Sequence, residues 1–524
     1  MALHVFYGLV AVGVAIGVAQ WRLALFVMAL IAAVQDPLRK LVPGAPGYLV
    51  LATALVLMAA ILGLVSNYPP WWRGFGWYFP RIRLAMVLFV LACIPAALIS
   101  ATYGPGSWLL TLLGVFSYGS LLLSMVVGFY FAYGLGDIRR FLAFYCLVSS
   151  VMLVGGLIQY FDLWPGARVI GTEALDMEWL RYGEGYIVKM IAGFYRSPDV
   201  MGWHAAAVAM LAVILAMTGR GPGRWLWFAL TAAALVELLL CGRRKMVYMI
   251  PFFLLGVVVL YSLSGVRRQW FGILGVVLLP LVSIGIIGDW LGDDSTQVRY
   301  YTDNPRDTVD QLHRHGFASV IGTYEQAGFF GSGLGVATPG SHHLQVARPR
   351  VWQESGPSRV MVELGVPGLL ALVGVMVAVL SAAWRVTRYH LLATTPMAPY
   401  AVGLFAFFLA NVGSLVVSGQ ILADPFIAAF LGMSIGMVLS FARLPVPHPG
   451  WGWRGWSGVT GVTGDRIRGG DGTGGSLGGR DGWDGWGDRG ERDGRGDWGD
   501  WGGGGERPGR ALESAARGAG GLGG

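Results

Sequence analysis

Two polar segments interrupt a chain that is otherwise strongly apolar, and they hold most of the side chains that could do chemistry. The larger segment covers residues 289–365 and the smaller one residues 164–199. Together they contain arginines and a lysine, which can stabilise developing negative charge, and carboxylates and histidines, which can accept a proton. The sequence therefore predicts a catalytic or binding site where these segments meet the membrane surface.

The acidic and histidine side chains of the larger segment differ in their surroundings. Glu354 comes shortly before the next apolar run, and Glu363 lies nine residues further on, near the entry to that run. An ionisable group at membrane depth is costly and so is a functional candidate, and local pairing is the alternative for Glu363. His342 and His343 are adjacent in a loop bounded by glycine and proline. They lack a carboxylate or thiol at a spacing typical of metal ligands, so solvated histidines and no metal site are predicted.

Cationic side chains occur at two positions where their charge indicates a possible function. A short turn carries Arg243, Arg244 and Lys245 between two apolar runs, on the side of the membrane where cations are normally scarce. Either an anionic ligand is bound there, or the spans are miscounted and the turn is an ordinary cytoplasmic anchor. In the smaller segment, Lys189 and Arg196 flank a glycine just before the next apolar run. Their position indicates a role in ligand binding.

Composition restricts the class of protein that carries these residues. The chain is 55% hydrophobic and only 13% charged, with a mean hydropathy of +0.58, whereas a soluble domain is about 25% charged. The net charge of +8 comes largely from short loops between apolar runs, where basic residues set topology, so nucleic acid is not predicted as a partner. The three cysteines lie in or beside apolar runs and predict neither a disulfide framework nor a metal site. No cofactor is expected.

The apolar runs predict an all-α polytopic integral membrane protein of about 12–13 transmembrane helices. A span needs roughly 20 apolar residues to cross about 30 Å of hydrocarbon. Thirteen runs are candidates, of which the second is short and the fifth is long. They cover residues 4–20, 22–35, 48–66, 83–102, 108–134, 141–163, 200–218, 225–241, 246–264, 269–288, 366–384, 397–418 and 425–442.

Charge predicts the orientation of these spans, because cytoplasmic loops carry an excess of lysine and arginine. The cation-rich loops alternate along the chain with poorer ones, which places both polar segments on the outer side. The cytoplasmic set contains Arg22, Arg73, Arg81, Arg83, Arg139, Arg140, Arg220, Arg224, Arg267, Arg268, Arg385 and Arg388. Residues 1–450 then form a transmembrane catalytic domain. Residues 451–524, which are dominated by glycine, tryptophan, aspartate and arginine, form a disordered cytoplasmic tail.

The larger segment has helical periodicity of its own. Asn304 and Pro305 suit an N-cap and first helical position, and Gly328 suits a helix end. Apolar residues between them recur every three or four positions and predict an amphipathic helix, which could lie along the membrane or roof a cavity. This face contains Val309, Leu312, Gly316, Val320, Tyr324 and Ala327. Three alternating glycines at 331–335 predict a flexible turn that allows close backbone approach.

Several short motifs, taken in order, resemble the O-antigen ligase and O-antigen polymerase superfamily of bacterial polysaccharide enzymes. The sequence GFYRSPD at the start of a span resembles the family's Gly-x-x-x-x-Pro-Asn motif, and CGRR is similar to its short Gly-Ser-Arg segment. The remaining motifs resemble the family's large periplasmic loop and an early basic segment. These motifs occupy residues 35–40, 193–199, 241–244, 314–317, 331–335 and 363–368. The resemblance covers roughly residues 30–440.

The resemblance implies glycosyl transfer from an undecaprenyl-diphosphate-linked glycan to an acceptor hydroxyl of a glycan or lipid, without a metal, at the periplasmic face of the bacterial inner membrane. Cations would stabilise the diphosphate leaving group and a base would accept the acceptor's proton. The expected catalytic residues are Glu354, Arg243, Arg244 and Arg314. The expected substrate-binding residues are Lys189, Arg196, His342, His343 and Glu363.

One departure and one alternative accompany this interpretation. Ligases of the family carry a histidine where this chain has Glu354, so Glu354 acts as base, or His342 or His343 replaces the missing histidine, or this member has another activity. The glutamate favours a polymerase-like relative. A flippase for lipid-linked glycans, or another polysaccharide transporter, is the alternative from a different class. Transporters carry ionisable groups near the bilayer midplane, whereas the polar residues here gather outside the spans.

Overall fold

The computed structural model describes most residues of the chain up to Leu444. The described residues are 2–183, 185–219, 221–263, 300–301, 317–338, 340–341, 344, 346, 351 and 353–444. Arg314, His342, His343, the predicted span 269–288 and the tail 451–524 lie outside these residues. The predictions made for them stay predictions.

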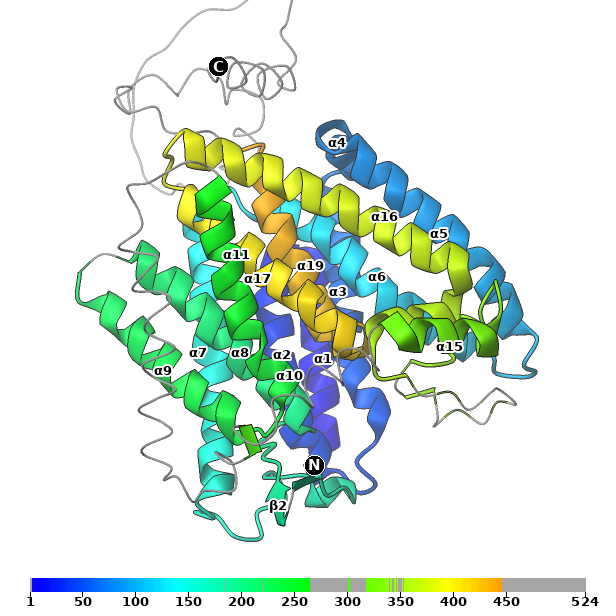
Figure 1. The fold of residues 1–524 in the computed structure, drawn as a ribbon, viewed down its shortest axis with the longest axis vertical. Coiled ribbons are helices and arrows are strands. Elements are labelled where there is room, and N and C mark those ends of the chain that lie inside the picture. Colours follow the sequence, from blue (N-terminus) through cyan, green and yellow to red (C-terminus); the bar gives the residue numbers. More distant parts are fainter. Residues whose placement is uncertain are drawn as a thin grey trace, which may run out of the picture. The chain divides into compact units, whose positions relative to one another are not determined.

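The fold class predicted from hydropathy is confirmed. Among the described residues, ten helical segments are long and apolar enough to cross a membrane, and two shorter apolar helices accompany them (Figure 1). All twelve coincide with predicted runs. The long segments are α2 (Trp21–Leu41), Gly47–Asn67 including α3 (Ala52–Asn67), α5 (Pro80–Ala101), α6 (Trp108–Phe131), α7 (Leu135–Tyr160), α8 (Pro198–Thr218), α9 (Gly223–Leu240), α10 with α11 (Arg244–Val247 and Met249–Leu263), α16 (Gly356–Leu392) and α17 (Ala398–Val417). The shorter ones are α1 (Ala2–Ala19) and α19 (Pro425–Ser440).

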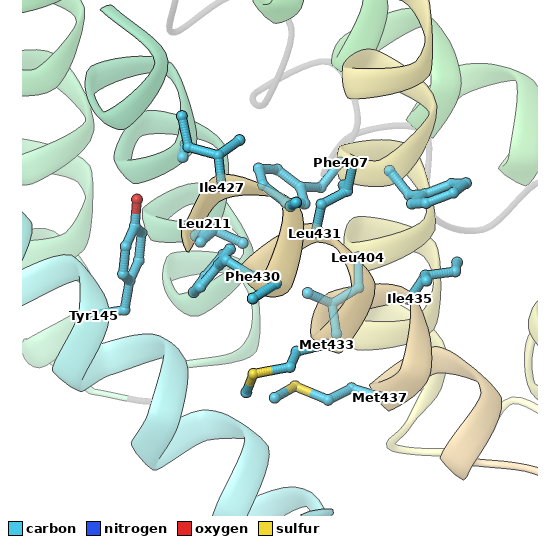
Figure 2. Close-up of a cluster of buried hydrophobic side chains, with 14 of the residues drawn as sticks. Tyr145, Leu211, Leu404, Phe407, Ile427, Phe430, Leu431, Met433, Ile435 and Met437 are labelled. Carbon is cyan, nitrogen blue, oxygen red and sulfur yellow. The ribbon is translucent and has the colours of Figure 1, made fainter. Parts of the chain in front are cut away.

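The core of the bundle surrounds α19, whose sixteen residues are all buried. Side chains from α7, α8 and α17 converge on it (Figure 2). The rings of Tyr145 and Phe430 lie 4.2 Å apart, and Leu211 and Phe407 close the same cluster. Lipid tails are as apolar as these side chains, so close packing rather than removal from water holds helices together in a membrane.

Glycines bring α6 and α19 into backbone contact. Gly432 and Gly436 form a G-x-x-x-G pattern along one face of α19, and Gly128 lies opposite on α6. A Cβ atom at Gly436 would overlap the backbone oxygen of Met125, and one at Gly432 would overlap that of Leu121. Small residues at this spacing are typical of close helix pairs in membranes.

The long helix α16 is broken near its start. Gly365 has φ 65° and ψ −163°, outside the helical region, and Pro367 follows it. Ser355 caps the helix, because its Oγ accepts a hydrogen bond from the amide of Ser358 at 3.2 Å. Residues 356–364, which the sequence analysis assigned to the outer loop, are therefore helical and carry Glu363 on a defined face.

The described residues of the two polar segments also form a helix and a hairpin. The helix predicted to end at Gly328 is α15 (Phe317–Ala327), and Gly328 has φ 72°, as expected of a helix-ending glycine; the predicted start at Asn304 lies outside the described residues. The smaller segment forms an antiparallel hairpin of β1 (Leu180–Gly183) and β2 (Tyr186–Lys189), which the sequence analysis did not predict. Short helical pieces complete the fold: η1 (Gly47–Leu51), α4 (Trp71–Tyr78), η2 (Glu173–Leu175) and α18 (Gln420–Ala423).

Replacing Gly436 by alanine tests the α6–α19 contact. Alanine would normally stabilise a helix by about 1 kcal/mol relative to glycine, but here its methyl group meets backbone that cannot rotate away, and overpacking costs about 1–3 kcal/mol. We expect a lower thermal unfolding midpoint in detergent. Gly374→Ala is the matched control, because nothing lies within 4 Å of a Cβ atom there. Equal midpoints for the two variants would contradict the packing argument.

Candidate functional site

A buried arginine joins three distant parts of the chain at one end of the bundle. Arg196 donates through Nη1 to Asp36 Oδ1 at 3.3 Å and through its backbone amide to Asp36 Oδ2 at 3.0 Å. Its Nη2 pairs with the Asp424 carboxylate. Both aspartates are buried, and no more than 15% of the arginine side chain is exposed. The two carboxylates thus more than neutralise Arg196.

Local sequence positions each member of this triad. Asp424 is the N-cap of α19, where its Oδ1 accepts from the amides of Phe426 and Ile427 at 2.8 and 3.1 Å. Asp36 lies near the end of α2, directly before Pro37. Arg196 follows the tight turn at Gly193, which has φ 54° and lies so close to α7 that a side chain would contact its backbone. The proline and the glycine are therefore part of the site's framework.

The electrostatics of the triad favour its charged form. Burial opposes ionisation of Asp424, but the charge and hydrogen bond of Arg196 and the helix amides outweigh it, so the pKa of Asp424 is lowered. Burial likewise opposes the charge of Arg196, and the two aspartates overcome it and raise its pKa. This geometry keeps Arg196 charged and paired with the two aspartates.

A second group, next to the first, has two cations and one carboxylate among the described residues. Asp199, in the first turn of α8, lies 2.8 Å from Arg243 Nη2 and 2.9 Å from Lys245 Nζ. The Arg243 guanidinium also stacks on the ring of Trp179 at 4.8 Å. One carboxylate therefore serves two cations. Arg244 points elsewhere, stacking on Tyr300 at 4.2 Å and donating to its backbone oxygen.

A third group is fully buried where α16 begins. Arg359 and Glu363 are 1% and 0% exposed, with 3.7 Å between Nε and Oε1. Glu363 accepts hydrogen bonds from Tyr118 OH at 2.7 Å, from Thr338 Oγ1 at 2.9 Å and from the Ala337 amide at 3.0 Å. Both of its carboxylate oxygens are engaged, which indicates that it fastens α6, α16 and the 331–341 segment together.

Glu354 connects the third group with the first. Its side chain is exposed, while its backbone oxygen accepts from the amide of Gly419 at 2.5 Å, just before α18. The Leu422 oxygen of α18 accepts from Ser117, whose Oγ in turn accepts from Arg359 Nη2 at 2.9 Å. Asp424 of the first group comes two residues after Leu422, so the third group adjoins the first.

The opposite end carries its own cations. Arg22 donates to the Tyr130 oxygen at 3.1 Å, and Arg443 donates to the Phe129 oxygen at 2.8 Å, so the two arginines satisfy carbonyls at the C-terminal end of α6. Cations at a helix C-terminus also interact favourably with the helix dipole. The structure thus separates Arg22 from the 243–245 turn, as the alternation of loops along the sequence predicts.

The expected site residues are distributed unevenly. Arg196, Arg243 and Glu363 belong to the three groups, Glu354 adjoins the third, and Arg244 lies beside the second. Lys189 lies outside the three groups: it is exposed and pairs with Glu173 and Glu178 of its own segment, at 3.6 and 3.9 Å. Arg314, His342 and His343 fall outside the described residues.

The sequence analysis did not select Asp36, Asp199, Asp424 or Arg359 as site residues. A residue pair four apart on a helix, as in Arg359 and Glu363, is a signal for an ion pair, and Asp424 before a proline is a signal for an N-cap. Neither signal names the partner across the bundle. His204 was also missed: its ring stacks on Tyr195 at 4.8 Å, and its Nδ1 is 2.9 Å from Tyr145 OH.

No protein-family model matches this chain, and no curated protein matches it either. Within the part of the chain that the structure describes, no three histidine, cysteine or acidic side chains are grouped in a way that could hold a metal ion. What the site can do must therefore be argued from its charges. It offers a cation pair sharing one carboxylate, an exposed carboxylate, and a set of buried ion pairs that hold them in place.

Replacing Asp424 by asparagine tests the triad. Breaking a buried ion pair costs about 3–5 kcal/mol, because a charge is left without its partner. Glu173→Gln breaks an exposed pair instead and should cost at most about 1 kcal/mol. Both free energies are measured by unfolding in detergent.

The pH dependence of stability has a defined sign. Because the pKa of Asp424 is lowered on folding, its contribution is present above its unfolded pKa and is lost as the pH falls through the lower folded pKa. We therefore expect the difference between wild type and Asp424→Asn to shrink towards acidic pH. A difference that stays constant down to pH values well below the usual aspartate pKa of about 4 would contradict the pairing.

Proposed function

We propose that this protein is a metal-independent membrane glycosyltransferase of the O-antigen polymerase or ligase type. It transfers a glycan from an undecaprenyl-diphosphate carrier to an acceptor hydroxyl, with its site facing the periplasm from the bacterial inner membrane. The observation that carries the proposal is that, among the described residues, the two cations Arg243 and Lys245 share one carboxylate, Asp199. The ordered motifs of the sequence support it.

The proposed reaction breaks the bond between the anomeric carbon and the diphosphate oxygen, and forms one between that carbon and the acceptor oxygen. The acceptor's proton passes to a base, and the diphosphate leaves with the bonding electron pair. Preorganised cations lower the barrier by stabilising the charge that develops on the leaving group. Arginine suits this role, because it stays charged and can bind phosphate through two nitrogens.

Charge balance decides which cations serve the diphosphate. Arg196 has two carboxylate partners, so we assign it a positioning role, holding the start of α8 against α2 and α19. Among the described residues, Arg243 and Lys245 share the one carboxylate of Asp199. This charge balance therefore favours this turn as the diphosphate subsite.

Glu354 is the proposed base. Its carboxylate is exposed, as an acceptor-facing group must be, while its backbone is held by Gly419 and the following serine caps α16. Glu363 has no free carboxylate oxygen for an acceptor, and we assign it a positioning role.

The transporter alternative is less well supported. Transporters hold their substrates near the bilayer midplane, often at broken helices. In the described residues, Asp36 lies near the end of α2 and Glu237 near the end of α9, which favours chemistry at a membrane surface. Glu363 differs, because it lies beside the break in α16 and accepts from Tyr118 near the middle of α6.

Replacing Glu354 by glutamine tests the base. General-base catalysis contributes typically about 10²–10⁴-fold, so product formation should fall by that factor. The assay uses the full chain in proteoliposomes with an undecaprenyl-diphosphate-linked repeat unit, and product length is read on gels. Glu325→Gln is the matched control, because Glu325 is also an exposed carboxylate of the same segment. Normal product from the Glu354 variant would refute the assignment.

Replacing Lys245 by glutamine tests the diphosphate subsite. A hydrogen bond to a charged group contributes about 1.5–3 kcal/mol, so donor binding should weaken by about 10–100-fold. Lys189→Gln should leave donor binding unchanged, because Lys189 pairs with carboxylates outside the three groups. Binding is measured by titrating the lipid-linked donor into the protein in nanodiscs. The opposite ranking of the two lysines would move the subsite to the hairpin.

A further inference from the structure

The helix α15 directs its serine and threonine side chains towards the protein and its large apolar side chains outward. Ser319 Oγ lies 2.6 Å from Ser358 Oγ of α16, and Thr323 is buried on the same side. On the outer side, Ile321 and Tyr324 are 66% and 44% exposed. A surface helix in water normally has the reverse arrangement, with its apolar stripe facing the protein.

Two phenylalanines extend this exposed surface directly after the helix. Phe329 and Phe330 are 52% and 51% exposed, and their rings form an edge-to-face pair 5.0 Å apart. We call Ile321, Tyr324, Phe329 and Phe330 the α15 patch. Large apolar side chains that are exposed close together in the sequence are typical of a surface that contacts a partner.

The segment that follows the patch lies beside the neighbouring spans, at a level inside their ends. The amide of Leu334 donates to the Ala96 oxygen at 3.1 Å, five residues before α5 ends, which corresponds to about 7.5 Å at 1.5 Å per residue. On α6, a Cβ atom at Gly114 would overlap the Leu334 side chain. Gly114 comes six residues after α6 begins, or about 9 Å along it. The segment after the patch therefore lies at the depth of the terminal turns of the spans.

The patch is also continuous with surface that must face lipid. The Phe329 oxygen accepts from the Val366 amide at 2.9 Å, at the start of the apolar part of α16. On that part, Leu370 and Val373 are 65% and 50% exposed, as expected for the outside of a membrane span. Figure 1 shows α15 beside this end of α16. Aromatic side chains are favoured at the boundary between headgroups and hydrocarbon.

We propose that the α15 patch inserts into the phospholipid leaflet at this end of the bundle and anchors the large polar segment at the membrane interface. Depth, continuity with the outer face of α16 and the aromatic composition point to lipid as the occupant. The anchor goes beyond the proposed activity and does not depend on it. The anchor fixes the depth of α15 relative to the membrane surface. Through the contact of Ser319 with Ser358, it also fixes the depth at which α16 begins.

The test is hydroxyl-radical footprinting of the full chain in phosphatidylcholine nanodiscs, read by mass spectrometry. Each oxidation rate is normalised to that of the same residue in the unfolded chain. Tyr182, on the β1–β2 hairpin, is the internal control, since it is 75% exposed and lies away from the spans. We expect Tyr324, Phe329 and Phe330 to react several-fold more slowly than Tyr182. Rates equal to that of Tyr182 would place the patch in water and overturn the proposal.

A second measurement distinguishes lipid from protein as the cover. Nanodiscs containing phosphatidylcholine with a diazirine in its acyl chain are irradiated, and lipid adducts are mapped by mass spectrometry. We expect adducts on the peptide holding Phe329 and Phe330, as on the peptide holding Leu370, and none on the peptide holding Tyr182. Slow oxidation without adducts would mean that protein, from this copy or a second one, covers the patch, and would overturn the proposal.

Discussion

Neutralising buried cations is the constraint on which this end of the bundle depends. A guanidinium cannot be removed from water without carboxylates or hydrogen bonds that replace its hydration. Arg196 meets this requirement with Asp36 of α2 and Asp424 at the start of α19, two residues far from it in sequence. The same requirement fixes where α8 begins, because Arg196 directly precedes it.

The position of α8 then determines the rest of the site. Asp199 lies three residues after Arg196 and pairs with Arg243 and Lys245, which follow the end of α9. Arg359 and Glu363 close a separate buried pair that fixes α16 against α6. Arg196 and Arg359 each pair with carboxylates, whereas Arg243 and Lys245, among the described residues, share Asp199. Charge balance, rather than the mere presence of arginine, therefore separates positioning residues from candidates for ligand binding.

Hydropathy was sufficient to predict the twelve apolar helices that the structure describes, and charge alternation predicted that Arg22 and the 243–245 turn are at different ends. They work because each is a local property averaged over about twenty residues. The pairing of Asp36 with Arg196 could not be predicted, since it joins segments 160 residues apart through a fold that the sequence does not display. The helical start of α16 was missed because its polar residues face protein rather than water. Lys189 was selected for its place beside a span, whereas its partners are two glutamates of its own segment.

The two proposals meet at Glu354, although they rest on different observations. A lipid-linked donor keeps its tail in the bilayer, so its diphosphate stays near the headgroup layer, and an enzyme must bring its base to that height. Ser355 and Ser358 follow Glu354 in the capped start of α16, and Ser319 of α15 contacts Ser358. An anchor that fixes the height of α15 at the interface therefore also fixes that of Glu354. Packing and lipid contact would thus place the base beside the donor. An enzyme with a soluble donor obtains the same placement by closing a cleft.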